Sequence, residues 1–253
     1  MNSLIAAFPL TLANLSSLTI SFREADAIGK SIIFILIVMS IVAWSVMVSK
    51  WLELKKTLLL TRQFQSAYTQ QPHPFSLFAA RKRFLASPLY TIYLAAAKEA
   101  AFIAGEAAGG AVLSPDTLAE ATRFRFNAVQ MDIIRRAADR TCSEQAMELE
   151  EKMPILAISI SAAPFLGLLG TVWGVLDAFV NMSTHFGGAL LSAVAPGISG
   201  ALLTTVVGLL VALPSAIGYN LIVSDIKKMC VRMDSFSDEL MADLQSACSA
   251  REV

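Results

Sequence analysis

Residues 149–222 limit the possible folds of this chain more than any other stretch. Between Met153 and Ser224 the sequence holds one charged residue, Asp177. One crossing of a bilayer needs about 20 apolar residues, so this stretch is long enough for two crossings. Polar and flexible residues gather where such a hairpin would turn, in the sequence NMSTHFGG. We therefore predict two membrane helices, at residues 154–180 and 190–222, joined by a loop at 181–189.

Small residues recur at helical spacing along both predicted helices. In lipid, helices associate through close backbone approach and interhelical hydrogen bonds, so stripes of small residues mark packing faces. The residues that we assign to helix packing are Gly167, Gly170, Gly174, Gly197, Gly200 and Gly208. Two helices with such faces can pack against more partners than the hairpin itself supplies, which predicts an oligomer or a tightly packed bundle.

Hydroxyl groups lie near the middle of both predicted crossings. Thr171 falls in the first, and Thr205, with Thr204 beside it, falls in the second. In an antiparallel hairpin these residues would lie at similar depth. Polar groups inside a membrane often line ion paths, but a threonine in a helix also often bonds its own backbone four residues earlier. From spacing alone both interpretations stay open.

A third crossing is predicted before the hairpin, which makes the chain an all-α membrane protein with three transmembrane helices and long helical cytoplasmic extensions. Residues 31–49 carry no charge, and Lys50 and Trp51 follow as an interfacial anchor. We expect a periplasmic N-terminal segment at 1–30, a cytoplasmic helical domain at 50–153 and a cytoplasmic C-terminal helix at 223–253. Because Arg23 is the first basic residue, a cleaved signal peptide is disfavoured, and 1–22 are expected to form a short amphipathic segment.

The distribution of basic residues predicts the orientation. Fourteen of the 20 lysines and arginines lie at 50–152, and only two precede Lys50. Cytoplasmic loops carry the excess of such residues, so the N-terminus is expected outside and the C-terminus inside.

The sequence offers no sign of catalysis or of a cofactor. His73 and His185 are isolated, and the three cysteines, Cys142, Cys230 and Cys248, lack metal-ligand spacing. No nucleophile and base are paired and no phosphate-binding loop is present, so we predict no enzyme, no metal and no cofactor. The formal net charge is zero, which gives no indication of nucleic-acid binding.

The crossings themselves lack a proton carrier at mid-depth. They contain no Lys, Arg or Glu, and Asp177 lies near the outer end. A proton path through a bilayer needs a titratable group, or a water chain that ends in one. A threonine hydroxyl can hydrogen-bond water but does not hold a proton at ordinary pH. If this chain conducts protons, the carrier is expected from another subunit.

Two segments resemble the signature helices of the TolQ/ExbB family, whose members are inner-membrane subunits of proton-driven motors distantly related to MotA. They are PFLGLLGTVWGVLDAF at residues 164–179 and APGISGALLTTVVGLLVALPSAIGYN at residues 195–220. Residues 149–164 are more similar to TolQ than to ExbB. The resemblance implies three crossings, with the N-terminus outside, in the bacterial inner membrane.

The resemblance also implies partners and roles. A pentamer of the larger subunit would surround a single-pass TolR/ExbD-like protein carrying a membrane aspartate, and a TolA/TonB-like protein would receive the work. Thr171 and Thr205 would face that aspartate, with Thr204 beside them, and Asp177 would lie at the periplasmic mouth. The family commonly has glutamate at the position of Gly200. Three functions stay open: a TolQ-like motor subunit for the Tol-Pal system and division, an ExbB-like subunit for TonB-dependent transport, and a non-conducting scaffold.

Overall fold

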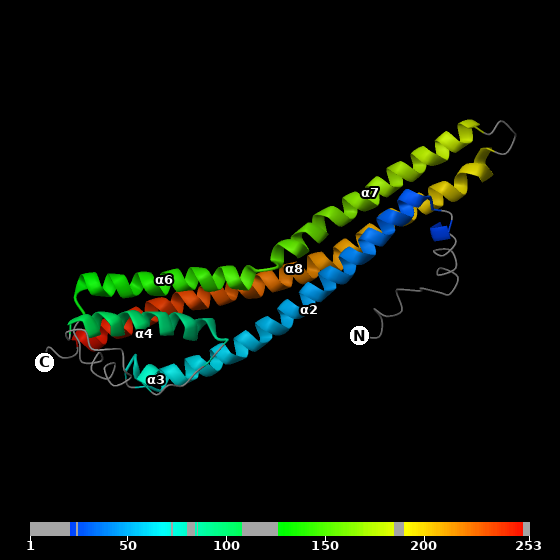
Figure 1. Cartoon of the computed structure of the whole chain (residues 1–253). Coiled ribbons are helices and arrows are strands. Elements are labelled where there is room, and N and C mark those ends of the chain that lie inside the picture. The colour runs from blue at the N-terminus through cyan, green and yellow to red at the C-terminus, as the bar shows by residue number, and fades with distance from the viewer. Residues whose placement is uncertain are drawn as a thin grey trace, which may run out of the picture. The chain divides into compact units, whose positions relative to one another are not determined.

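The computed structural model describes residues 21–23, 25–71, 73–79, 84, 86–107, 126–184 and 190–249. Within these ranges the chain is helical and contains no strand. The elements are α2 (Ala27–Thr69), α3 (Ser76–Ala79), α4 (Pro88–Ala107), α6 (Ala128–Glu150), α7 (Met153–Thr184) and α8 (Leu190–Ser249). The chain divides into two compact units. The long helices α2 and α8 (Figure 1) belong to both, because the first part of each lies in one unit and the second part in the other.

The first unit comprises Met1–Val48 and Lys152–Asn220. In it the first part of α2 runs beside α7 and the first part of α8 (Figure 1). A small apolar core joins the three helices where Leu36 of α2 meets Ala163 of α7 and Val211 of α8. The outward side chains are large and apolar, for example Phe34, which is 68% exposed. Such a surface suits lipid or further protein and not water.

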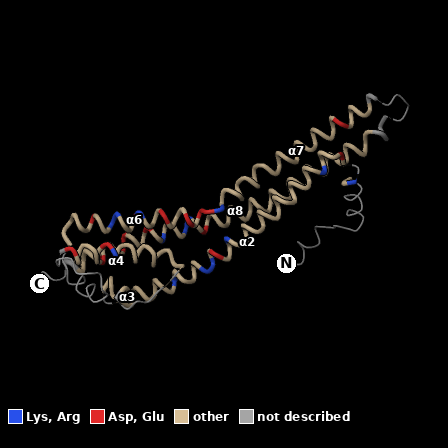
Figure 2. Tube along the Cα trace, viewed as in Figure 1, with Lys and Arg blue, Asp and Glu red and all other residues tan. Residues whose placement is uncertain are grey.

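The second unit comprises Ser49–Glu151 and Leu221–Val253. Its core is a cluster of aromatic rings centred on Phe64 of α2. The rings around it belong to Tyr68, Tyr90, Tyr93 and Phe236, with centroids 5.5–6.1 Å from that of Phe64. Lysines, arginines and acids mark the helices of this unit (Figure 2), and they are sparse along α7.

Within the described ranges three helices are long and apolar enough to cross a membrane, as the sequence predicts. α2 has 43 residues and α8 has 60, so at 1.5 Å per residue each is longer than the ~30 Å hydrocarbon layer. The long helical extensions that the sequence predicts after the first and last crossings are confirmed, because α2 continues to Thr69 and α8 to Ser249.

The sequence from Pro115 to Lys152 has a continuous helical pattern, which predicts one helix over this range, but α6 ends at Glu150, two residues before Lys152. Glu151 and Lys152 form a turn, and Lys152 has a positive φ of 69°. Pro154 explains the break, because its ring would collide with the carbonyl of Glu150 if the helix continued. In the first turn of a new helix a proline is tolerated, and α7 begins at Met153. The predicted start of this helix at Ser114–Asp116 lies outside the described residues.

Candidate functional site

The face between α7 and α8 is built on glycines that allow the two backbones to touch. A Cβ atom placed on Gly208 would lie 2.6 Å from the carbonyl oxygen of Ala163, and one on Gly167 would lie 2.9 Å from that of Thr204. At Gly174 it would lie 2.7 Å from the Cβ of Ala201. These distances are shorter than van der Waals contact, so any side chain there would push the helices apart.

Gly170 and Gly197 lie on the same face. A Cβ atom on Gly170 would meet the side chain of Thr204, with 2.7 Å to its Cβ. At Gly197 the nearest atom is the Cβ of Ala178, 3.1 Å away. Five of the six glycines assigned to packing from the sequence therefore line the contact between α7 and α8.

The three threonines converge at this close contact. Thr171 Oγ1 and Thr205 Oγ1 are hydrogen-bonded to each other across the two helices. Hydroxyls of Thr171, Thr204 and Thr205 all lie within 3.0–3.1 Å of one acceptor, the carbonyl oxygen of Gly167. Thr204 is fully buried and also lies 2.7 Å from the carbonyl oxygen of Ala201.

The backbone bond that the sequence analysis considered is present at Thr171, and the ion-path interpretation stays a prediction. Thr171 lies within bonding distance of the backbone four residues earlier and also reaches across to Thr205. Thr171 and Thr205 are half-buried, whereas Thr204 is buried. A pair of this kind can rotate to bond water or a carboxylate, but at ordinary pH it does not carry a proton.

Gly200 differs from the other five glycines, because it faces the segment before α2 and not α7. A Cβ atom there would lie 2.9 Å from the Cα of Ala25 and 3.1 Å from the carbonyl oxygen of Ser21. Backbone atoms cannot rotate away from such a contact. The position therefore accepts only glycine while Ser21 and Ala25 lie against α8.

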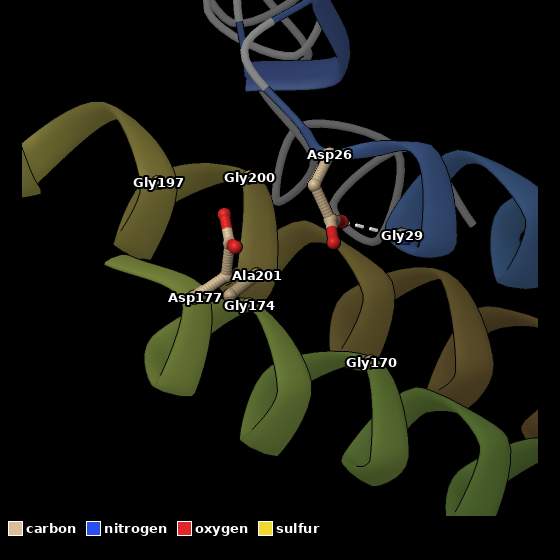
Figure 3. Close-up of a pocket in the computed structure, with 8 residues that line it drawn as sticks. All are labelled: Asp26, Gly29, Gly170, Gly174, Asp177, Gly197, Gly200 and Ala201. Atoms are coloured by element: carbon tan, nitrogen blue, oxygen red, sulfur yellow. Dashed lines mark hydrogen bonds between the residues drawn. The ribbon is translucent and has the colours of Figure 1, made fainter. Parts of the chain in front are cut away.

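A small cavity of about 30 Å³ opens beside Gly200. That is room for one or two water molecules. Its lining consists of small residues and two acids: Asp26, Gly29, Gly170, Gly174, Asp177, Gly197, Gly200 and Ala201. In Figure 3 the carboxylates of Asp26 and Asp177 are both directed into the space between α2, α7 and α8. Asp177 Oδ2 also accepts a hydrogen bond of 3.0 Å from the Asn181 amide.

Comparison with known protein families identifies this arrangement. Residues 113–235 match the sequence model of the MotA/TolQ/ExbB proton channel family. The chain contains a MotA/TolQ/ExbB family domain. The matched range includes the whole of α7 and the part of α8 that carries the threonines and glycines described above.

Individual relatives of both named branches are similar to the chain. The Tol-Pal system protein TolQ of Pseudomonas aeruginosa is 38% identical over 114 residues, which are 45% of this chain and 49% of that protein. TolQ of Haemophilus influenzae is 41% identical over 85 residues, which are 34% and 37% of the two chains. The alignments therefore span half or less of these TolQ relatives. The biopolymer transport protein ExbB of Salmonella typhimurium is 27% identical over 245 residues, which are 92% and 90%.

Asp26 is a residue of this site that the sequence analysis missed. The available signal was an aspartate directly before an apolar helix, which is typical of an N-cap. Its Oδ1 atom accepts a hydrogen bond of 2.7 Å from the Gly29 amide, in the first turn of α2. An aspartate at this position predicts that Asp26 caps α2. It does not predict that Asp26 lies near α7 and α8, because a local pattern carries no information on distant segments.

The remaining polar residues noted in the sequence lie apart from this site. Among the described residues no group of histidine, cysteine and acidic side chains could hold a metal ion, and His185 lies outside them. Cys142 is buried in the second unit, where desolvation and the hydrogen bond of its thiol to Asp234 raise its pKa from 9.0 to about 12.

Lys50, predicted as an interfacial anchor, is 1% exposed, and its ammonium group donates a hydrogen bond of 3.3 Å to the carbonyl oxygen of Glu148. The cation over the Trp51 ring is Lys55.

Proposed function

We propose that this chain is the pore and stator subunit of a motor driven by the proton-motive force in a bacterial inner membrane. The observation that carries the proposal is the hydroxyl pair of Thr171 and Thr205, held across two apolar helices in a domain of a proton channel family. The pair can hydrogen-bond a proton carrier but cannot replace one. The carrier is then the membrane aspartate of a TolR/ExbD-like single-pass partner.

The topology proposed for this role follows the positive-inside rule. The N-terminus and the loop between α7 and α8 face the periplasm, and the second unit lies in the cytoplasm. Several copies, as in a pentamer, surround the partner, so that the exposed apolar faces of α7 and α8 contact neighbouring subunits and lipid. Asp177 then lies near the periplasmic mouth. A TolA/TonB-like protein receives the work.

Of the two motor roles, we favour the TolQ-like one, which serves the Tol-Pal system of the cell envelope. The similarity of residues 149–164 to TolQ supports it. Identity does not separate the two roles, because TolQ and ExbB relatives both reach 38% and the alignment over 92% of the chain is to an ExbB. Complementation distinguishes the two roles. Rescue of detergent sensitivity in a strain lacking TolQ supports the first role, and rescue of TonB-dependent iron uptake in a strain lacking ExbB supports the second. A scaffold of the same fold would conduct no protons.

The hydroxyl of Thr205 provides the test of the pore role. Thr205→Val keeps the shape of the side chain and removes the hydroxyl, and Thr205→Ser keeps the hydroxyl. In vesicles containing the chain and its single-pass partner, we expect Thr205→Val, like Thr205→Ala, to abolish proton uptake and Thr205→Ser to retain most of it. Copurification with the partner checks that all variants assemble. A Thr205→Val complex that assembles and conducts like the wild type contradicts the pore role.

A further inference from the structure

Residues 21–23, 25 and 26 define a short strap that lies on α8 at Gly200. Ser21 Oγ and Ser199 Oγ are 2.8 Å apart and share a hydrogen bond. The strap is closed on itself by the bond of 3.1 Å from the Ala25 amide to the Ser21 carbonyl. Lys30 of α2 reaches back to the Arg23 carbonyl at 3.1 Å. Contacts at both ends therefore fix the strap between α2 and α8.

The strap brings a carboxylate to the end of the contact between α7 and α8. Asp26 ends the strap, and its Oδ1 atom caps α2 through Gly29 while the side chain lines the cavity. Gly170 and Gly174, which flank the threonine contact on α7, line the same cavity. Apart from Asp26 and Asp177, every lining residue is a glycine or an alanine. Asp26 and Asp177 are thus the two ionisable groups beside this water-sized space.

We propose that Asp26 is a proton-exchanging residue of the path, held beside the cavity by a strap that requires glycine at position 200. Its carboxylate accepts a proton from hydronium, which leaves water, and returns the proton to the next water molecule in the path. Hydroxyls cannot perform this exchange at ordinary pH, whereas a carboxylate beside the cavity can. The inference rests on the proton-conducting function proposed above.

Variants of Asp26 distinguish this role from simple helix capping. Asparagine and serine are N-caps comparable to aspartate, so Asp26→Asn and Asp26→Ser keep the bond to the Gly29 amide and remove the carboxylate. Asp26→Ala removes both. We expect Asp26→Asn and Asp26→Ser to lower proton uptake by about tenfold or more, with unchanged thermal stability. This loss is smaller than the ~10²–10⁴-fold typical of a positioned proton-transfer group, because Asp177 remains.

Two outcomes overturn the role of Asp26. In the first, Asp26→Asn and Asp26→Ser assemble and conduct like the wild type. In the second, only Asp26→Ala loses flux, which assigns Asp26 to capping alone. The measurement uses vesicles containing the chain and its single-pass partner. If wild-type vesicles take up no protons, the proposed function fails. If wild-type and Asp26→Asn vesicles take up protons at the same rate, the proposed function stands and only the role of Asp26 fails.

A cross-link tests the strap independently of conduction. Ser21→Cys with Ser199→Cys is expected to form a disulfide on mild oxidation, since the two hydroxyl oxygens are 2.8 Å apart. Val206 lies on the same side of α8 but ~10.5 Å further along the axis, so Ser21→Cys with Val206→Cys is the matched control. Adding Gly200→Ala is expected to reduce the first cross-link, because a Cβ atom would meet the strap backbone. Failure of the first pair to cross-link, or equal cross-linking by the control pair, contradicts the strap.

Discussion

The substitution Gly208→Ala tests how the hairpin is held together. The added Cβ atom would lie 2.6 Å from the Ala163 carbonyl oxygen and 3.2 Å from the Cα of Gly167. Both neighbours are backbone atoms of α7, so no side-chain rotation relieves the contact. Since ordinary contact begins at about 3.4 Å, the two helices must separate here by roughly 0.8 Å.

That separation has a calculable consequence for the threonine contact one turn away. The bonds from Thr204 and Thr205 to the Gly167 carbonyl oxygen are 3.0 Å long, and a shift of this size lengthens both beyond hydrogen-bonding range. Interhelical hydrogen bonds in membranes contribute about 0.6 kcal/mol each on average. Overpacking a tight interior typically costs about 1–3 kcal/mol. We therefore expect Gly208→Ala to lower the free energy of unfolding by about 2–4 kcal/mol.

Unfolding of the purified chain in mixed micelles, by titration with a denaturing detergent, measures this change. Gly197→Ala is the control, because its nearest neighbour is a methyl group at 3.1 Å and the next atom lies at 3.8 Å. We expect it to cost less than about 1 kcal/mol, since a small adjustment relieves the contact. A Gly208→Ala chain as stable as the wild type, or less affected than Gly197→Ala, refutes the proposed packing.

Two further predictions concern the second unit. Phe64 is fully buried at the centre of the aromatic cluster, so Phe64→Ala should cost about 3–5 kcal/mol in an unfolding titration, whereas Leu59→Ala, at a 58% exposed site on the same helix, should cost less than about 0.5 kcal/mol. An equal cost for the two variants would exclude that core. Burial raises the pKa of Cys142 to about 12 in the folded chain, from 9.0, so its stabilising effect is complete below pH 9 and is lost as the pH rises towards 12. Unfolding midpoints measured from pH 8 to 11 should fall less steeply for Cys142→Ala, and identical slopes would contradict this reasoning.

Patterns within one helix were sufficient to predict the hairpin. Gly167 and Gly208 could be assigned to packing because a helix repeat places small residues on one face, and α7 and α8 are neighbours in the chain. The meeting of Thr171 and Thr205 follows from the similar depth of two residues in an antiparallel pair. In both cases the helical repeat and the hairpin connection are visible in the sequence, so the approximate position of each side chain follows from them.

Contacts between distant segments could not be predicted in this way. Gly200 has the same spacing as the packing glycines, yet its neighbour is Ala25, which belongs to a segment with no periodic signal. Lys50 follows an apolar run and so predicts an exposed anchor, but the carbonyl of Glu148 and the carboxylate of Glu53 hold it in the interior of the second unit. A buried cation is tolerated when it is paired in this way.

The central claim is that the chain supplies a wall of hydroxyls and obtains its mid-membrane acid from another subunit. Proton uptake into vesicles under an applied membrane potential tests it most directly, with the chain alone and with its single-pass partner. We expect uptake only with a partner that carries its membrane carboxylate, and none when that acid is replaced by its amide. Equal uptake by the chain alone would contradict the account.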